Sequence, residues 1–284
     1  MLSNEIRAQV LTDALPYMQK YHGKVVVIKY GGNAMTDENL KHSVIGDIVL
    51  LRLAGVKVVL VHGGGPEIEE MLNKINHKSS FVDGLRYTDA QTADIVQMVL
   101  AGKVNKSLVA MVNQKGGKAI GLSGSDGLLI EAEIKSEKYG FVGEILNVNA
   151  DYVSTLLDDG YIPIISTVTT DKNGQILNIN ADTAAARIAA ALKATSMLLL
   201  TNTRGVLKDK NNESSLIPEI TLEEIPQLIK SGVVSAGMLP KVSCCEEAIR
   251  RGVPQALIID GRVPHSIIIE MYTNSGIGTL FKDV

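Results

Sequence analysis

Two lysines in this sequence lie where a positive charge needs an anionic partner. Lys29 ends the apolar run 25–28 and precedes the glycines at 31–32. A lysine at the end of an otherwise buried strand needs an anion or solvent beside it. Lys241 follows Pro240, which suits the first turn of a helix, where the dipole favours anions. A bound phosphate satisfies both lysines, so the pattern favours phosphoryl transfer; the alternative for Lys241 is a solvated surface side chain.

Two glycine clusters follow apolar runs near the start of the chain. The first is at 31–32, and the second is His62-Gly63-Gly64-Gly65-Pro66, after the run 58–61. A strand that ends in glycines and opens a helix presents free backbone N–H groups, which bind phosphate and other anions. A glycine triplet alone is equally typical of a tight turn. Neither cluster matches the P-loop or the dinucleotide fingerprint, which disfavours a nicotinamide dehydrogenase.

Short polar side chains form a third candidate group. Asn178, Asn180 and Asp182 precede an alanine-rich helix expected over 183–193. Asp182 is either the N-cap of that helix or a partner of both lysines. Asn178 and Asn180 share one face if the chain there is extended. Arg86, expected in a loop, suits bidentate capture of a substrate carboxylate, or is an exposed structural arginine.

Composition narrows the classes of function. The chain has 284 residues and a formal net charge of −3, so no basic excess favours nucleic acid. It has no Trp and three Phe, which disfavours a base-stacking platform. We find no apolar run near the ~20 residues of a membrane span, and no signal or transit peptide. We therefore expect a cytoplasmic protein, or a stromal one if it is organelle-encoded, in which the adjacent Cys244 and Cys245 are reduced core thiols.

The elements that must position these residues alternate between strands and helices, which predicts a mainly parallel sheet in an αβα sandwich. We place a lobe boundary near residue 175, with no linker to stop the sheet from running through both lobes. Expected strands are 24–30, 56–62, 118–123, 161–168, 197–200 and 255–260, with hairpins at 128–133/141–147 and around 171–174. Expected helices are 37–54, 66–76, 89–113, 150–159, 183–193, 222–231, 238–251 and 264–270.

An additional helix is expected before the first strand, over residues 4–22. Asn4 is its candidate N-cap, and Pro16 should kink or split it. Its apolar stripe (Ala8, Leu11, Leu15 and Met18) has helical spacing and must pack on the body of the protein or on another subunit.

Five motifs, in order, resemble those of the amino-acid kinase family, in particular its N-acetylglutamate kinase branch. The resemblance covers residues 24–284 and implies the amino-acid kinase fold. It also implies ATP-dependent phosphorylation of the side-chain carboxylate of N-acetyl-L-glutamate, which yields an acyl phosphate in arginine biosynthesis. The motifs are Lys29-Tyr30-Gly31-Gly32-Asn33-Ala34-Met35, His62 to Pro66, Gly84-Leu85-Arg86, Asn178 to Asp182, and Gly237-Met238-Leu239-Pro240-Lys241.

The resemblance also implies a division of labour. Residues 24–175 form the lobe for the amino acid, residues 176–284 the lobe for ATP, and residues 1–23 an oligomerisation helix. Lys29 and Lys241 stabilise the transferring phosphoryl group and Asp182 organises them, while amides of Gly32 and Gly64 reach the γ-phosphate. N-acetylglutamate contacts Gly64, Gly65, Arg86, Asn178 and Asn180; the nucleotide contacts Gly31, Gly32, Asn202, Gly205 and Met238.

The residue chemistry agrees with this reaction. A carboxylate nucleophile is already ionised at pH 7, so the site needs no general base. Its work is to hold two anions together and to neutralise charge on the transferring group. We expect Mg²⁺ to bind mainly to the ATP phosphates and water, without a protein cage. One departure is Asn202, where the family commonly has Asp in its Thr-Asp-Val-x-Gly-Val loop; Asn keeps the hydrogen-bonding shape without the charge.

Regulation is implied by the same resemblance. Arginine-inhibited relatives have a similar N-terminal helix, which interlaces dimers into a hexamer, and a similar tail at 270–279. We therefore expect arginine to bind between helix and tail, at Glu270 and Gly276. Some relatives also bind a nitrogen-signalling protein. The alternatives are an acetyl-aminoadipate kinase, or a non-catalytic nucleotide or arginine sensor, which would not need both Lys29 and Lys241.

Overall fold

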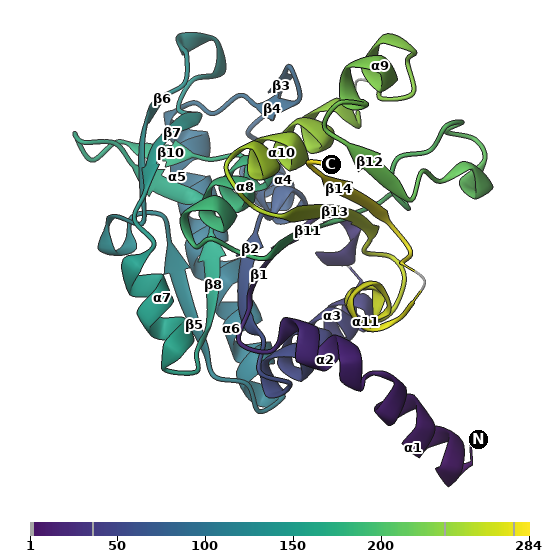
Figure 1. Cartoon of the computed structure of the whole chain (residues 1–284). Coiled ribbons are helices and arrows are strands. Elements are labelled where there is room, and N and C mark those ends of the chain that lie inside the picture. The colour runs from purple at the N-terminus through teal and green to yellow at the C-terminus, as the bar shows by residue number, and fades with distance from the viewer. Residues whose placement is uncertain (1–2, 36, 236, 275) are drawn as a thin grey trace.

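The computed structural model describes residues 3–35, 37–235, 237–274 and 276–284, around a central eight-stranded sheet (Figure 1). Neighbouring strands are parallel except β13 and β14, so the expected mainly parallel sheet is confirmed. The strands, in spatial order, are β12 (Glu219–Thr221), β14 (Thr279–Lys282), β13 (Gln255–Asp260), β11 (Ser196–Thr201), β1 (Val25–Tyr30), β2 (Lys57–His62), β8 (Ile162–Ser166) and β5 (Ala119–Ser123).

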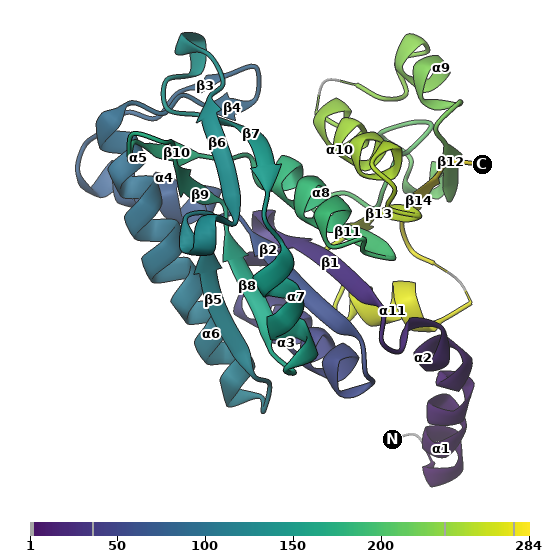
Figure 2. The same cartoon turned by 60° about the vertical axis from the view of Figure 1, so that its left-hand side comes forward.

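Helices cover both faces of the sheet, which confirms the predicted αβα sandwich (Figures 1 and 2). One face carries α3 (Glu38–Leu53), α4 (Gly65–Lys74), α5 (Ala90–Gln97), α6 (Asn105–Gln114) and α11 (Ser266–Tyr272). The other carries α7 (Asp151–Asp158), α8 (Ala181–Ala191) and α10 (Leu239–Arg250). Shorter elements are α9 (Ile225–Lys230) and the antiparallel ribbons β3/β4 (Phe81–Val82, Leu85–Arg86), β6/β7 (Ile130–Ile134, Gly143–Val148) and β9/β10 (Val168–Thr170, Ile176–Asn178).

The period-two alternation of β1 assigns its side chains to two different cores. Val26 and Ile28 belong to the core under α3 and α6, whereas Val27 belongs to the core under α8. Lys29 follows Val27 in this alternation and lies on the α8 side. The same rule that buries the valines therefore delivers a lysine to the start of α8.

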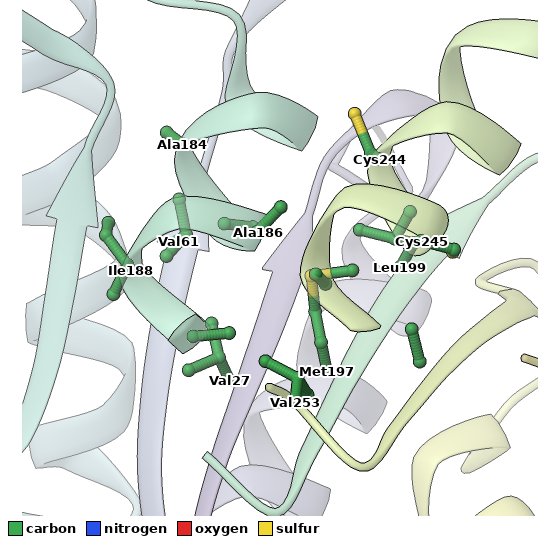
Figure 3. Close-up of a cluster of buried hydrophobic side chains, with 14 of the residues drawn as sticks. Val27, Val61, Ala184, Ala186, Ile188, Met197, Leu199, Cys244, Cys245 and Val253 are labelled. Carbon is green, nitrogen blue, oxygen red and sulfur yellow. The ribbon is translucent and has the colours of Figure 1, made fainter. Parts of the chain in front are cut away.

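Small side chains let α8 approach the sheet and α10 closely. Figure 3 shows Ala184 and Ala186 on α8, beside the strand valines Val27 and Val61, with Cys244 and Cys245 on the neighbouring α10. Cys244 and Cys245 are buried and free, as the sequence predicted, and burial raises the pKa of the Cys244 thiol to about 12. The residues labelled in this view of the core are Val27, Val61, Ala184, Ala186, Ile188, Met197, Leu199, Cys244, Cys245 and Val253.

The N-terminal segment is split as predicted, but its cap is different. Helices α1 (Asn4–Asp13) and α2 (Leu15–Tyr21) meet at Ala14, and Pro16 lies in the first turn of α2. Ser3, not Asn4, caps α1: its hydroxyl accepts from the Ile6 N–H at 3.3 Å. Helix α1 has no buried residue and projects away from the sheet (Figures 1 and 2).

The helix expected over 89–113 starts after Asp89 but is not uniform. A π-helical segment, Met98–Val104, joins α5 to α6, and apolar periodicity gave no sign of it.

The whole run Ala90–Gln114 is long and apolar enough to cross a membrane by length and composition. The search of the sequence for a long apolar run had not indicated this. Nearly half (44%) of the most apolar stretch of this run is buried within the protein, and buried core helices also meet this criterion of length and composition. Strands β12 and β14 were also not predicted.

A buried carboxylate on α3 fixes the start of α11. Asp47 accepts from His265 Nδ1 at 2.6 Å, and the hydroxyl of Ser43 accepts from the His265 backbone N–H at 2.7 Å. Burial raises the pKa of Asp47, against the opposing effects of His265 and of the first N–H groups of α11. Segments more than two hundred residues apart are thus joined at one point.

We predict that Asp47→Ala lowers the free energy of unfolding by about 2 kcal/mol, because the His265 ring and the first N–H groups of α11 then lose their buried acceptor. Urea denaturation measures this change. Asp158→Ala is the control, since it breaks a largely exposed pair with Lys57 and should cost less than about 1 kcal/mol. Equal losses in the two variants would contradict the anchoring role.

Candidate active site

A cavity of about 560 Å³ opens where the carboxyl ends of β1 and β2 meet the start of α8. Crevices at this edge of a parallel sheet are common ligand sites. Most of the residues that the sequence singled out line it: Lys29, Gly31, Gly32, Gly64, Gly65, Arg86, Asn178 and Asn180. The other predicted site residues do not line this cavity: Asp182, Lys241, Asn202, Gly205, Met238, Glu270 and Gly276.

Asp182 lies between the two lysines, one of the two arrangements that the sequence allowed. Its Oδ1 is 2.8 Å from Lys29 Nζ, and its Oδ2 is 3.6 Å from Lys241 Nζ. Burial acts to raise the pKa of Asp182, but the two ammonium groups outweigh it and hold the pKa below its usual range. The carboxylate is therefore ionised, and the three side chains together carry one excess positive charge beside the cavity.

Asn180, not Asp182, is the N-cap of α8. Its side-chain oxygen accepts from the backbone N–H groups of Asp182 and Thr183, both at 3.0 Å. Asp182 therefore lies in the first helical turn, where the dipole also favours its charge. Both residues suit a cap, and only the capping bond distinguishes them. Because the Asn180 oxygen is used in this way, its amide nitrogen is the group left to face the cavity.

Arg86 is in strand β4 of a small ribbon, not in the expected loop. Its guanidinium donates to Glu69 Oε2 at 2.7 Å, to the Gly65 carbonyl at 3.2 Å, and to the Ser79 hydroxyl. The Phe81 ring lies 4.8 Å away. The hydrogen bond from Arg86 also lowers the pKa of Glu69. Arg86 is thus held against the second glycine turn, a rigid arrangement for presenting its remaining donors.

Asn178 ends β10, and its amide donates to the Thr88 hydroxyl at 3.1 Å. This bond ties Asn178, which lines the cavity, to a residue 90 positions earlier in the chain, just after Arg86. The sequence did not identify Thr88 or the Arg86 partners Glu69, Ser79 and Phe81. The only signal in the sequence for these partners was the position of Glu69 relative to the glycines, which places it on the cavity side of the helix that follows them.

The residues expected to contact a nucleotide lie beside the first glycine turn, in the loop that follows β11, and at the start of α10. A Cβ on Gly32 would be 2.8 Å from Asn202 Oδ1, so the turn and the Asn202 loop lie in close contact. Gly205 has a φ of 152°, and its turn is held by Thr279, whose hydroxyl accepts from the Val206 N–H at 2.9 Å. Met238 is the N-cap residue of α10 and immediately precedes the turn that carries Lys241.

The two residues expected to contact arginine lie together at the end of α11. Glu270 Oε2 accepts from the backbone N–H groups of Ile277 and Gly278, at 2.7 and 3.1 Å. A Cβ on Gly276 would lie 2.8 Å from Glu270 Oε1. Glu270 therefore orders the tail around itself in this structure. Among the residues that the structure describes, no group of three or more His, Cys, Asp or Glu side chains is arranged to hold a metal ion.

His62 lies directly beneath the second glycine turn and is completely buried. Burial lowers its pKa to about 4, so it is neutral at physiological pH. The unfolded chain takes up this proton near pH 6.5, whereas the folded chain does so only near pH 4. The folded state must therefore lose stability as pH falls from 6.5 towards 4.

We predict that lowering the pH from 7 to 5 destabilises the protein by roughly 2 kcal/mol through His62 alone. His62→Asn, which cannot titrate in this range, should show a correspondingly smaller loss. Urea denaturation of both proteins at the two pH values measures the difference. Equal pH dependence in the two proteins would show that His62 is not the group responsible.

Comparisons with known proteins agree on one family. A model described as the amino acid kinase family matches residues 24–260. The chain is 52% identical over 283 residues to an acetylglutamate kinase of Clostridium beijerinckii (99% of each chain), and 53% identical over 275 residues to one of Nostoc sp. (96% of this chain, 93% of that one). A crystal structure of N-acetylglutamate synthase from Neisseria gonorrhoeae, complexed with coenzyme A and N-acetyl-glutamate, has the same fold. Its TM-score is 0.86 at 22% identity, over 98% of this chain and 63% of that one.

Proposed function

Because this chain belongs to the amino acid kinase family, we propose that it phosphorylates the side-chain carboxylate of N-acetyl-L-glutamate with ATP, in arginine biosynthesis. The observation that carries the proposal is Asp182 between Lys29 and Lys241 beside the cavity. About 50% identity to acetylglutamate kinases over nearly the whole chain supports the choice of substrate. The acceptor is the amino-acid carboxylate and the product is an acyl phosphate.

We assign the amino acid to the cavity, which is lined mainly by side chains and glycines from the lobe of residues 24–175, together with Asn178 and Asn180. Arg86 and the amides of Gly64 and Gly65 provide donors for its carboxylates. Arg86 is held by Glu69 and by the Gly65 carbonyl, so it need not reorganise when the substrate binds. The cavity, at about 560 Å³, is large enough for an acetylated amino acid with its side chain extended towards Lys29.

We assign ATP to residues 176–284, with its γ-phosphate at the first glycine turn. Gly31 and Gly32 lie between Lys29 and Asn202, since a Cβ on Gly31 would be 2.8 Å from Lys29 Nζ. The turn thus brings backbone N–H groups and an ammonium group to one place. Mg²⁺, when bound with the nucleotide, supplies further charge neutralisation at the phosphates. Asn202 and the Gly205 turn provide neutral polar contacts, without a carboxylate that would repel the phosphates.

The chemical step follows from these charges. The acceptor carboxylate and the γ-phosphate repel each other, so they must be held together by positive groups. As negative charge spreads over the transferring group, Lys29 and Lys241 stabilise it, and Asp182 keeps the two ammonium groups in place. No proton has to be removed from the nucleophile, which fits an active site whose imidazole, His62, is buried and neutral.

The test is a hydroxylamine trap of acyl phosphate with N-acetylglutamate and MgATP. We predict that Lys29→Ala and Lys241→Ala each lower kcat by about 10²–10³-fold, because each removes a group that stabilises the transition state. Lys57→Ala, which breaks a surface pair with Asp158, is the matched control and should leave kcat within about twofold.

Two outcomes would overturn the proposal. No hydroxamate from the wild-type protein above the Lys29→Ala background would exclude the kinase and leave a nucleotide or arginine sensor. A higher kcat/KM for N-acetyl-aminoadipate, which is one methylene longer, would replace the substrate by that homologue.

We also propose feedback inhibition by arginine in a hexamer assembled through α1. Helix α1 buries nothing in its own chain, and its apolar side chains Ile6, Val10 and Leu11 are exposed. Helix α2 contacts α11, and the Tyr17 hydroxyl donates to Asn274. An effector bound between α2 and the tail would therefore contact Glu270 and the helix that directly follows α1, the assembly helix.

We predict that deletion of residues 1–13 converts the hexamer to a dimer and weakens inhibition by arginine at least about tenfold. The deletion removes only α1, whose residues are not buried, so the rest of the fold should persist. Mass photometry and inhibition curves give the two readouts, and the uninhibited kcat serves as the control for folding. An unchanged hexamer with full inhibition would contradict the assignment.

A further inference from the structure

His62 is a buried titratable residue beside the candidate active site for which phosphoryl transfer has no use. In β2, Val59 and Val61 belong to the core under α8, while Val58 and Leu60 belong to the core under α3 and α6. The alternation therefore directs His62 away from Lys29 and towards α6. The residue ends its strand immediately before the glycine turn, so a contact made by its ring can act on the turn.

Both ring nitrogens of His62 have a partner. Nδ1 is 2.8 Å from the carbonyl oxygen of Gly63, and Nε2 is 3.1 Å from the amide nitrogen of Asn105. A carbonyl oxygen only accepts, so a hydrogen bond to Gly63 requires a proton on Nδ1. In a neutral imidazole the other nitrogen must then accept, and the orientation of Asn105 tests this requirement.

The surroundings of Asn105 fix the orientation of its amide group. Its nitrogen also donates to the carbonyls of Ile164 and Leu122, at 2.8 and 3.3 Å. Its oxygen accepts from Lys106 Nζ at 3.1 Å, and an ammonium group only donates. A flipped amide would place its oxygen against two carbonyls and its nitrogen against the ammonium group. The amide nitrogen of Asn105 therefore faces Nε2, and its two N–H groups are shared among Nε2 and the two carbonyls. Because an amide nitrogen cannot accept a hydrogen bond, Nε2 carries no proton and His62 is the Nδ1–H tautomer.

Strand β5 leaves room for this network. A Cβ on Gly121 would lie 2.0 Å from Asn105 Oδ1 and 2.8 Å from Lys106 Nζ. The Gly121 carbonyl also accepts from Lys106 at 3.2 Å. Any larger residue at position 121 would displace the amide group that fixes His62.

The π-helical segment places both contacts of the turn on one face of the helix. The Asn105 N–H donates to the Leu100 carbonyl, an i to i+5 bond. In an α-helix, side chains five residues apart point about 140° apart, whereas the wider turn closed by an i to i+5 bond brings them closer to the same side. Leu100 meets the turn from this face: a Cβ on Gly64 would be 2.6 Å from its Cδ2. Leu100 thus packs on Gly64 while Asn105 reaches His62.

We propose that His62, held as its Nδ1–H tautomer by Asn105, is a positioning residue that fixes the Gly63 carbonyl and so aims the amides of Gly64 and Gly65 at the cavity. The π-helical segment is the device that brings Asn105 and Leu100 to this turn. The proposal deepens the proposed function and rests on it, because the amides matter to the reaction only if the cavity binds the acyl acceptor and the phosphoryl group.

A matched pair of amide variants separates the two ring contacts. In His62→Asn the amide nitrogen replaces Nδ1 and can still donate to Gly63, whereas in His62→Gln it replaces Nε2 and cannot. We expect His62→Asn to retain kcat within about threefold, and His62→Gln to lose at least about tenfold with little change in the KM for MgATP. A purely structural role would impair both variants alike. Equal activities of the two variants, high or low, would overturn the proposal.

Nitrogen NMR of histidine-labelled full-length protein tests the tautomer without relying on activity. The chain has five histidines, and His62→Asn identifies the signal by its loss. We expect Nδ1–H in the wild type, unchanged between pH 5.5 and 8, and a changed tautomer or exchange broadening in Gly121→Ala. Gly46→Ala, where a Cβ meets nothing within 4 Å, is the control.

An Nε2–H signal, or titration near pH 6.5, would overturn the proposal whatever the enzyme does. If the wild-type protein forms no acyl phosphate while His62 is the Nδ1–H tautomer, the failure belongs to the proposed function, and the positioning role in catalysis falls with it. If the protein is active and only the tautomer is wrong, the proposed function stands and this proposal fails.

Discussion

The charge balance at Asp182 is the interaction on which the rest of the site depends. A carboxylate buried there alone would be costly, and so would either lysine. Together the three groups compensate one another and leave one positive charge in excess. The constraint is demanding because β1, α8 and α10 must each deliver one group to within a few ångströms. The mainly parallel sheet does this by bringing the end of β1 to the start of α8, with α10 packed alongside.

Strand alternation then divides the work between the two faces of the sheet. Lys29 ends β1 on the α8 face, where charge is needed. His62 ends the neighbouring strand on the α6 face, where it is sealed from water. Each strand end therefore supports its glycine turn differently, the first with an ammonium group and the second with a neutral imidazole. A charged imidazole under the second turn would be costly, because it would be buried near Lys106 and its ring contacts, the Gly63 carbonyl and the Asn105 amide, are neutral.

Sequence patterns were sufficient where one local signal dominates. Apolar alternation and glycines predicted the sheet, both longer hairpins and the layers, and the chemistry of isolated lysines led to the Asp182 group. The patterns failed where the outcome depends on contacts from distant segments. Asn180 and Asp182 are both good caps, and only the packed helix start decides between them. Arg86 lies in a two-residue strand, too short to show any period. Strand β14 needs β13 and β12 as partners, and no property of its four residues announces it.

The features that escaped prediction are those that join the parts of the site to one another. Helix α4 begins at Gly65 and carries Glu69, so it supports the glycine turn and the Arg86 guanidinium at once. On its other side the same turn is fixed through His62 to α6. A shift of α4 would therefore move the donors for the substrate and the donors for the phosphoryl group together. Rigid coupling of this kind keeps two mutually repelling anions at a fixed separation, because neither binding element can relax away from the other.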